Sequence, residues 1–311
     1  MKSAKKMRII NIVLFIIFCL VFWGLAGNAA HCSDNDFTIV TTFTILADFA
    51  QNIAGPNNDV RVLSQIGAEV HEWELTARNF VDIEQADIVF YNGLNVEQWM
   101  NQVRSNLRSG VPLIAVGELC DYYTLPIIVG DYKGYPDPHI WMHPLGAISY
   151  VEVIRDALIE HNPRKASMYD KNASVYIEKI QELYDELQEI LSIIPKDNRV
   201  LITTEAAFIY FADAYDFTHD AVWGTNTEEE GTPQQMMRIM RVVDQRKPAG
   251  IFWESTGSNR YALSISADTE TPIFGPLYVD SVGELGSGAE TYLNFMKLNS
   301  TLLAKVLSPK R

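Results

Sequence analysis

The chain has 311 residues, of which 48% are hydrophobic and 11% aromatic, a composition typical of a globular protein with a sizeable core. Its formal net charge is −14, from 25 lysines and arginines against 39 aspartates and glutamates. An acidic surface repels phosphate groups, which argues against nucleic acids and anionic lipid surfaces as partners. With only three cysteines, a closed zinc site built from thiolates is also excluded.

The first thirty residues differ in character from the rest of the chain. Four basic residues within residues 1–8 precede an apolar run over residues 9–27, and small residues follow it. This order predicts a signal peptide over residues 1–30, which exports the remainder. An uncleaved anchor is the alternative, because an apolar run of almost ~20 residues can span a bilayer. Cys32 follows His31 instead of a small residue, so lipid attachment is not expected.

From residue 37 onward, short apolar segments alternate with amphipathic segments, which predicts a parallel α/β architecture. In the first half, strands are expected at residues 37–42, 60–66, 88–91 and 113–116, and helices at residues 45–53, 77–84, 96–107 and 144–161. A longer amphipathic stretch, residues 165–191, lies between Pro163 and the breaker cluster at residues 195–198. A helix of this length measures about 40 Å, and we expect it to join two lobes.

The second half of the chain repeats the alternation. Strands are expected at residues 200–203, 221–224 and 250–253, helices at residues 206–215, 233–246 and 260–269, and a further apolar stretch covers residues 273–279. The predicted fold is therefore α/β, with two lobes that each contain a mostly parallel sheet flanked by helices, joined by one long rigid helix. The predicted boundaries are residues 37–162 for the N-terminal lobe, 163–194 for the linking helix and 198–311 for the C-terminal lobe.

Four side chains that can bind a metal ion stand near the ends of predicted strands, namely His71, His139, Glu205 and Asp280. In parallel α/β sheets, ligands bind where the carboxyl ends of the strands and their loops converge. Two neutral imidazoles and two carboxylates supply nitrogen and oxygen donors, a mixture that suits Mn²⁺, Fe²⁺ or Zn²⁺. The two carboxylates also neutralise a divalent cation, which lowers the cost of burying it. Spacing alone makes this a weak prediction, and the local sequences strengthen it.

Five local sequences occur in a fixed order: GAEVHEWELTARNFVDIEQADIVFYNGLNVEQWM, DPHIW, TTEAAFIYFADAYDF, NTEEEGTPQQ and FGPLYVDSVGE. Together they resemble the substrate-binding proteins of bacterial manganese and zinc ABC importers, over nearly the whole chain after residue 30. The resemblance implies two α/β lobes bridged by one long helix, with a single metal ion at their interface. It places His71, His139, Glu205 and Asp280 at the four ligand positions.

The same resemblance implies the partners and the compartment. The ion would be delivered to the membrane permease of the importer and its ATPase, and we expect a monomer that binds no nucleic acid. Gram-positive members typically begin as lipoproteins, and this chain lacks that start, so a free periplasmic protein is expected, with anchoring by an uncleaved N-terminal segment as the alternative.

Two features of the sequence indicate which metal ion is bound. Zinc-type members usually have a histidine at the third ligand position and a His/Asp/Glu-rich loop before the second, whereas here Glu205 stands third and residues 121–135 contain no histidine. These features, with the NTEEEGTP segment, indicate the manganese-type branch, so Mn²⁺ is preferred, with Zn²⁺ or Fe²⁺ as alternatives. Most relatives have Asp-Pro-His at the first ligand, but this chain has Glu69-Val70-His71, and loss of the proline predicts a more mobile loop.

Two other functions are the alternatives. A metal-dependent hydrolase is possible in principle, because histidines and carboxylates also build catalytic sites. The sequence lacks a Gly-x-Ser-x-Gly elbow, a His-Glu-x-x-His motif and a phosphate loop, so no enzymatic activity and no catalytic residue is expected. An adhesin or surface-interaction protein is the third alternative, and no sequence feature specifies the surface it would use.

Several polar residues near the predicted ligands have other expected roles. His143 follows His139 by four residues but precedes a proline, so it is expected to form a loop hydrogen bond instead of binding metal. Asp137 and Glu254 are expected to orient ligands by accepting imidazole protons. The acidic run at residues 228–230 is expected to precede a helix, whose positive end favours carboxylates, rather than to form a second metal site.

Overall fold

The computed structural model describes residues 37–225 and 231–309. The residues from Phe37 onward form one compact unit. The predicted signal peptide, Cys32 and the acidic run at residues 228–230 lie outside the described residues. Within the described ranges, no helix is long and apolar enough to cross a membrane.

The first half of this unit is built on a four-stranded parallel sheet in the order β2-β1-β3-β4. Its strands are β1 (Thr38–Thr41), β2 (Asp59–Val62), β3 (Ile88–Tyr91) and β4 (Leu113–Ala115), and the helices that alternate with them are α2 (Thr44–Ala54), α3 (Ala77–Gln85), α4 (Met100–Asn106) and α5 (Val116–Leu119). The central strands β1 and β3 are buried along their whole length, as expected for strands of a parallel sheet covered on both faces.

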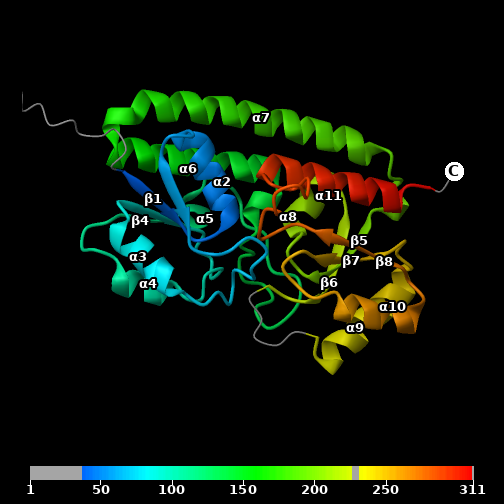
Figure 1. Cartoon of the computed structure of the whole chain (residues 1–311). Helices are drawn as coiled ribbons and strands as arrows, with labels where there is room; N and C mark the ends of the chain where they lie inside the picture. The colour runs from blue at the N-terminus through cyan, green and yellow to red at the C-terminus, as the bar shows by residue number, and fades with distance from the viewer. Residues whose placement is uncertain (1–36, 226–230, 310–311) are drawn as a thin grey trace, which may run out of the picture. The chain divides into compact units, whose positions relative to one another are not determined.

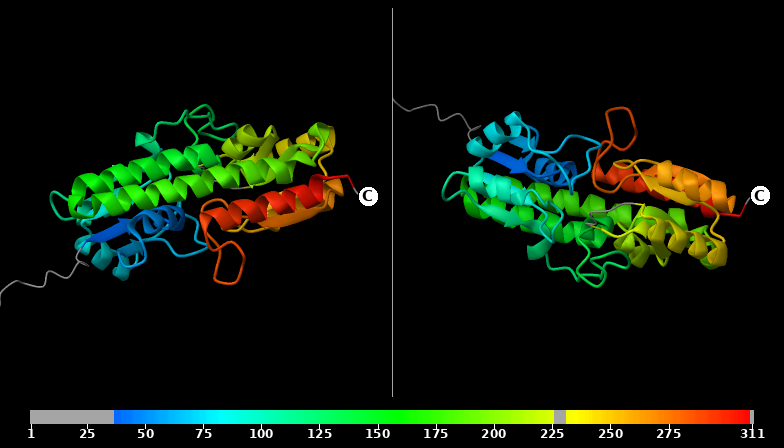
Figure 2. Two further views of the ribbon diagram at one scale, coloured as in Figure 1. Left: turned by 90° about the horizontal axis from the view of Figure 1, so that it is seen from above. Right: turned by 90° about the horizontal axis from the view of Figure 1, so that it is seen from below.

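Two long helices follow the first sheet and lie side by side (Figure 1). They are α6 (Pro144–His161) and α7 (Ala166–Ser192). The buried residues of α7 recur at intervals of three or four, and we call this set the α7 seam: Tyr169, Ala173, Tyr176, Ile180, Leu183, Leu187 and Leu191. Such spacing places them on one face of the helix. Figure 2 shows α7 running between α6 on one side and α2 and α11 (Tyr292–Leu307) on the other.

The second half contains two parallel strand pairs instead of one continuous sheet. The pairs are β5 (Val200–Glu205) with β6 (Thr218–Trp223) and β7 (Ile251–Glu254) with β8 (Ile273–Leu277), and the helices around them are α8 (Ile209–Tyr215), α9 (Pro233–Arg246), α10 (Arg260–Thr269) and α11. A hydrogen bond of 3.2 Å from the Glu205 amide to Oε1 of Glu254 links the ends of β5 and β7. The predicted α/β class, with parallel sheets flanked by helices and one long helix, is confirmed.

Buried hydrogen bonds tie the segments from the two halves to each other. The indole N–H of Trp141 donates to the Val279 carbonyl at 2.8 Å, and the Tyr292 hydroxyl donates to the Trp141 carbonyl at 2.8 Å. The Gly67 amide donates to Oγ of Ser281 at 2.8 Å. These bonds fix the loops of the first half against the segment that follows β8, and this is where the predicted ligands lie.

Candidate metal centre

The structure brings all four predicted ligand residues to one place. His71 lies in the loop between β2 and α3, and His139 lies directly before a short 3₁₀ turn, Ile140–Met142. Glu205 is the last residue of β5, and Asp280 follows the end of β8. The exposed fraction of the side chain is 7% for His71, 10% for Glu205 and 0% for both His139 and Asp280. The convergence follows from parallel strands, because the carboxyl ends of such strands lie at a common edge.

The donor atoms of these residues face one another. His71 Nε2 lies 3.5 Å from Glu205 Oε1, and His139 Nε2 lies 3.4 Å from Asp280 Oδ1. One ligand atom each from His71, His139 and Glu205 lie within 4.8 Å of one another. The two imidazole rings have centroids 5.9 Å apart and an interplanar angle of 74°, so they are not stacked. A single small cation could therefore contact both rings and the Glu205 carboxylate, with the Asp280 carboxylate next to His139.

Several of these buried atoms lack an ordinary hydrogen-bond partner within the described part of the chain. They are Nε2 of His71, Nε2 of His139 and both carboxylate oxygens of Asp280. Buried polar atoms are nearly always hydrogen-bonded, because desolvation without a partner is costly. Four such atoms gathered in one place are typical of a site that is completed by a ligand.

Asp137 orients the ring of His139. Oδ1 of Asp137 accepts hydrogen bonds from Nδ1 and from the backbone amide of His139, both at 3.0 Å, and Oδ2 accepts one from the Thr225 hydroxyl at 3.3 Å. The proton on Nδ1 leaves the lone pair of Nε2 facing Asp280. The expectation that Asp137 accepts an imidazole proton is confirmed.

A backbone carbonyl orients the ring of His71. Nδ1 of His71 lies 3.2 Å from the Val96 carbonyl oxygen, which can only accept, so Nδ1 carries the proton and Nε2 is free to bind. The turn that presents this carbonyl is held by the buried carboxylate of Glu97, which accepts from the Asn92 amide at 2.7 Å and from the Thr42 hydroxyl at 2.6 Å. Glu97 lies within the first of the five local sequences quoted above, but no role was predicted for it.

Glu254 does not orient an imidazole, so that expectation was wrong. Its Oε1 accepts from the Glu205 amide and its Oε2 accepts from the Thr204 hydroxyl. Burial, and then the charges of Glu205 and Asp280, raise the pKa of Glu254 well above its usual value. The Glu254 carboxyl therefore holds the end of β5, which carries Glu205, through its hydrogen bonds to Thr204 and Glu205.

His143 forms a loop hydrogen bond, as expected. Its Nδ1 accepts from the Leu145 amide at 3.1 Å and so caps the first turn of α6. Burial lowers the pKa of His143 to about 4. His143 is therefore a neutral capping group, and its Nδ1 is already occupied by the hydrogen bond from the Leu145 amide.

The charges of the centre favour protonated imidazoles when no cation is present. Burial by itself lowers the pKa of His71, but the neighbouring Glu205 carboxylate, and then Glu69 and Asp280, outweigh it and raise the pKa to about 10. Burial likewise opposes protonation of His139, and Asp137 and Asp280 outweigh it, so its pKa is raised well above the usual value. Protons and a metal cation therefore compete for the same nitrogens.

A fifth ionisable side chain, Glu69, reaches the centre and was not predicted as a site residue. Its Oε1 lies 3.9 Å from Nε2 of His71, and Glu69, His71 and Asp280 form a second set of donors within 4.8 Å of one another. The signal in the sequence was the departure from Asp-Pro-His at the first ligand, because glutamate has a longer side chain than aspartate.

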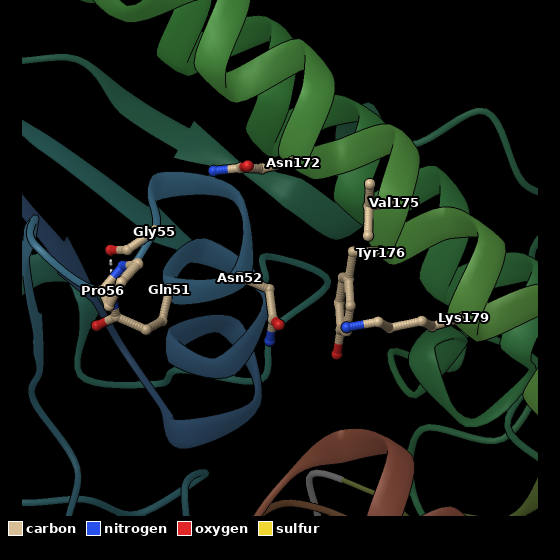
Figure 3. A pocket seen from close by; sticks show the side chains of 8 residues that line it. All are labelled: Gln51, Asn52, Gly55, Pro56, Asn172, Val175, Tyr176 and Lys179. Carbon is tan, nitrogen blue, oxygen red and sulfur yellow. Dashed lines mark hydrogen bonds between the residues drawn. The ribbon is translucent and has the colours of Figure 1, made fainter.

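The cavity drawn in Figure 3 is not a rival cation site. It has a volume of about 390 Å³ and lies between the end of α2 and the first half of α7. None of its eight lining residues is a histidine, a cysteine or a carboxylate. Divalent transition metals need such donors, so the four-residue centre is the better candidate.

Comparison with known proteins finds relatives over most of the chain. Residues 39–306 match the family described as "Zinc-uptake complex component A periplasmic". The chain is 38% identical over 282 residues to the iron-binding protein YfeA of Yersinia pestis, covering 91% of this chain and 90% of the relative. It is 35% identical over 302 residues to the manganese-binding lipoprotein MntA of Halalkalibacterium halodurans, covering 94% and 99%.

A solved structure has the same fold. The periplasmic zinc-binding protein TroA from Treponema pallidum superimposes with a TM-score of 0.82 at 25% identity, covering 88% of this chain and 100% of TroA. The fold is the α/β fold of this metal-binding protein, with parallel strands flanked by helices and one long helix. The chain belongs to the family of periplasmic components of metal-uptake complexes that its residues 39–306 match.

Proposed function

We propose that this protein captures a divalent transition metal ion outside the cytoplasm and delivers it to an ABC importer. His71, His139, Glu205 and Asp280 are the proposed ligands, with Mn²⁺ as the preferred cargo and Zn²⁺ or Fe²⁺ as alternatives. The observation that carries the proposal is the convergence of buried imidazole nitrogens and carboxylate oxygens without other partners. Iron, manganese and zinc each appear in the name of a relative cited above, which supports this class of cargo.

The donor set favours binding over catalysis. Four protein ligands close the coordination of a tetrahedral ion, whereas catalytic metal sites keep a position open for water or substrate. We therefore propose a binding protein, and the hydrolase and adhesin alternatives receive no support from the relatives, whose names describe metal binding. The importer's permease and ATPase are the proposed partners of a monomeric protein that binds no nucleic acid.

The compartment and the domain boundaries are part of the proposal. We propose that residues 1–30 are a signal peptide and that the mature protein acts in the periplasm, with residues 37–162 and 198–311 as lobes and residues 163–194 as the link. Intact mass of the protein recovered from the periplasm tests the cleavage. A mass that includes residues 1–30 would favour the uncleaved anchor instead.

A titration of metal-free protein lacking residues 1–30 tests the function. We expect binding of one ion of Mn²⁺, Zn²⁺ or Fe²⁺ per chain, with a rise in melting temperature by mass action. Glu205→Ala should remove most of that rise, while Glu182→Ala, on the exposed face of α7, should leave it unchanged. Absence of binding by the unaltered protein, or an equal rise in Glu205→Ala, would contradict the proposal.

The preferred ion requires a separate measurement. Zn²⁺ binds most nitrogen and oxygen sites more tightly than Mn²⁺ or Fe²⁺, so affinity in solution does not identify the cargo. Elemental analysis of protein isolated from its own periplasm does. Manganese as the major bound metal would support the proposed preference, and zinc or iron as the major metal would replace it.

A further inference from the structure

The five ionisable side chains at the metal centre differ in their access to water. The side chain of Glu69 keeps 32% of its surface exposed, compared with 10% or less for each of the four proposed ligands. Glu69 therefore lies on the solvent side of the centre. Its longer side chain also brings its carboxylate to 3.9 Å from His71 Nε2.

Two sets of donors overlap in this arrangement. His71, His139 and Glu205 form the deeper set, and Glu69, His71 and Asp280 form the outer set. His71 belongs to both. A cation held by the outer set can therefore pass to the deeper one without leaving the His71 nitrogen.

The outer set also has unused binding capacity. Nε2 of His71 and both oxygens of Asp280 are buried and without hydrogen-bond partners in the described part of the chain. Glu69 itself is held in place because its Oε1 accepts from the His71 amide at 3.3 Å. The described residues include no lysine or arginine that forms an ion pair with Glu69. Its cationic neighbour is therefore the His71 ring, whose nitrogen an incoming cation would also bind.

The loop of Glu69 is tied to the loop of Asp280. The Gly67 amide donates to Oγ of Ser281 at 2.8 Å, and Ser281 directly follows Asp280. The loops that carry Glu69 and Asp280 are therefore joined by a hydrogen bond two residues before Glu69 and one residue after Asp280. This contact makes the outer set a built feature and not a chance approach of a mobile side chain.

We propose that Glu69 is the first protein ligand that an incoming divalent cation meets, and that it holds the ion together with His71 and Asp280 before the ion reaches the four-residue centre. The inference rests on the proposed function and adds the route by which the cargo enters and leaves. Glu69 then acts on the rates of capture and release more than on the final affinity, because it stabilises the intermediate on the path in both directions.

Stopped-flow fluorescence tests this role with Mn²⁺ and Zn²⁺ as probes. The ring of Trp141 lies 5.1 Å from the ring of His139, so tryptophan emission reports arrival of the ion. We expect Glu69→Gln to lower the association rate about tenfold or more. Dissociation into excess chelator should slow as well, so that the equilibrium affinity changes far less than either rate. Glu69→Asp, which keeps the charge on a shorter side chain, should recover part of the association rate.

Glu72→Gln is the matched control. It removes the same charge from an exposed side chain in the same loop, so it reproduces any effect of long-range attraction. Unaltered rates in Glu69→Gln, or an equal slowing in Glu72→Gln, would overturn the inference. A loss of equilibrium affinity as large as that of Glu205→Ala would also overturn it, because Glu69 would then be a permanent ligand. Circular dichroism melts of the metal-free variants identify any that fail to fold.

The two proposals fail in different ways. If the unaltered protein binds none of the three metals, the proposed function fails. If it binds a metal in a Glu205-dependent manner and Glu69→Gln keeps the unaltered rates, only the role of Glu69 fails.

Discussion

Nδ1 of His139 and Oδ1 of Asp137 lie 3.0 Å apart, and both side chains are fully buried. Because the carboxylate accepts the Nδ1 proton, the opposite nitrogen of the ring is the one that can bind a cation once its own proton is displaced. Carboxylates in this position also increase the basicity of a histidine ligand. The pair therefore prepares the site for a metal before any ion arrives.

Asp137→Asn should weaken metal binding roughly 10- to 100-fold, the usual effect of removing such a partner. The amide cannot supply the negative charge, and it allows the ring of His139 to adopt the wrong tautomer. Competition with a chelator of known affinity measures the change. An affinity within about twofold of the unaltered protein would contradict the role assigned to Asp137.

Metal affinity should increase with pH across the neutral range. The raised pKa values of His71, about 10, and of His139 mean that both imidazoles carry an extra proton near pH 7 in the metal-free protein. Binding must displace these protons, so the apparent affinity falls as the pH is lowered. It rises with pH until the pH reaches the pKa of the imidazoles in the metal-free protein. Calorimetry in buffers of different ionisation enthalpy should detect release of up to about two protons per ion.

The control for this measurement is His161→Gln, which removes an exposed imidazole at the end of α6. It should leave the pH dependence unchanged. Affinity that is flat between pH 6 and pH 9 would argue against imidazole ligands.

Glu97→Gln should weaken both the fold and the site. The second oxygen of Glu97 accepts from the Gly93 amide at 3.2 Å, and the amide nitrogen of glutamine cannot accept there. A buried donor left without a partner costs about 1–3 kcal/mol. The turn that presents the Val96 carbonyl to His71 is thereby loosened, so we expect a lower melting temperature and weaker metal binding.

Glu118→Gln is the matched control for Glu97→Gln. Glu118 accepts from the Leu94 amide of the same turn at 3.1 Å, but its side chain is exposed. Exposed substitutions usually change stability by less than about 0.5 kcal/mol. Equal effects of the two variants would show that burial of Glu97 has no special importance.

Asp48→Asn should stabilise the protein near neutral pH. Oδ2 of Asp48 accepts from the Tyr176 hydroxyl at 2.8 Å and from the Tyr292 amide at 3.2 Å, but burial dominates and raises its pKa from 3.8 to about 6. Because the folded state prefers the protonated acid, ionisation of Asp48 reduces stability as the pH rises from 3.8 to about 6. Asparagine keeps an acceptor and removes the charge.

Thermal melts at two pH values check this expectation. At pH 7.5 the melting temperature of Asp48→Asn should exceed that of the unaltered protein by about 2 °C or more, and the difference should disappear near pH 4. Asp170→Asn, at an exposed position of α7, should change neither value. A lower melting temperature for Asp48→Asn at pH 7.5 would mean that the charge itself stabilises the contact.

Elements with strong local signals could be predicted from the sequence. The helix at residues 233–246 has the predicted bounds because Thr232 and Gln235 form a capping box and a proline occupies its first turn. The helix at residues 144–161 also begins at a proline. By contrast, α4 begins at Met100 and not at residue 96, because Glu97 holds a turn in which Leu94 and Asn95 have positive φ.

What could not be predicted depends on contacts between distant segments. Helix α11 was not predicted at all, and its burial depends on the neighbouring helix α7. The four proposed ligands were found through their residue types and their motifs. Glu69 and Glu97 were not, because Glu69 depends on the approach of Asp280 and Glu97 on its contact with Thr42, both far away in the chain.

The α7 seam determines whether fragments of this chain can fold independently. Its first half packs toward α2, where Asn172 donates to the Ile53 carbonyl, and its second half runs along α11, where Lys297 pairs with Glu186. A fragment ending near residue 195 would expose the apolar residues that α11 covers, and a fragment beginning at residue 198 would leave α11 without its support. We therefore expect neither fragment to fold alone, although the two expressed together should reassemble. The described part of the chain should therefore fold as one cooperative unit, in which the proposed metal centre joins segments from both halves.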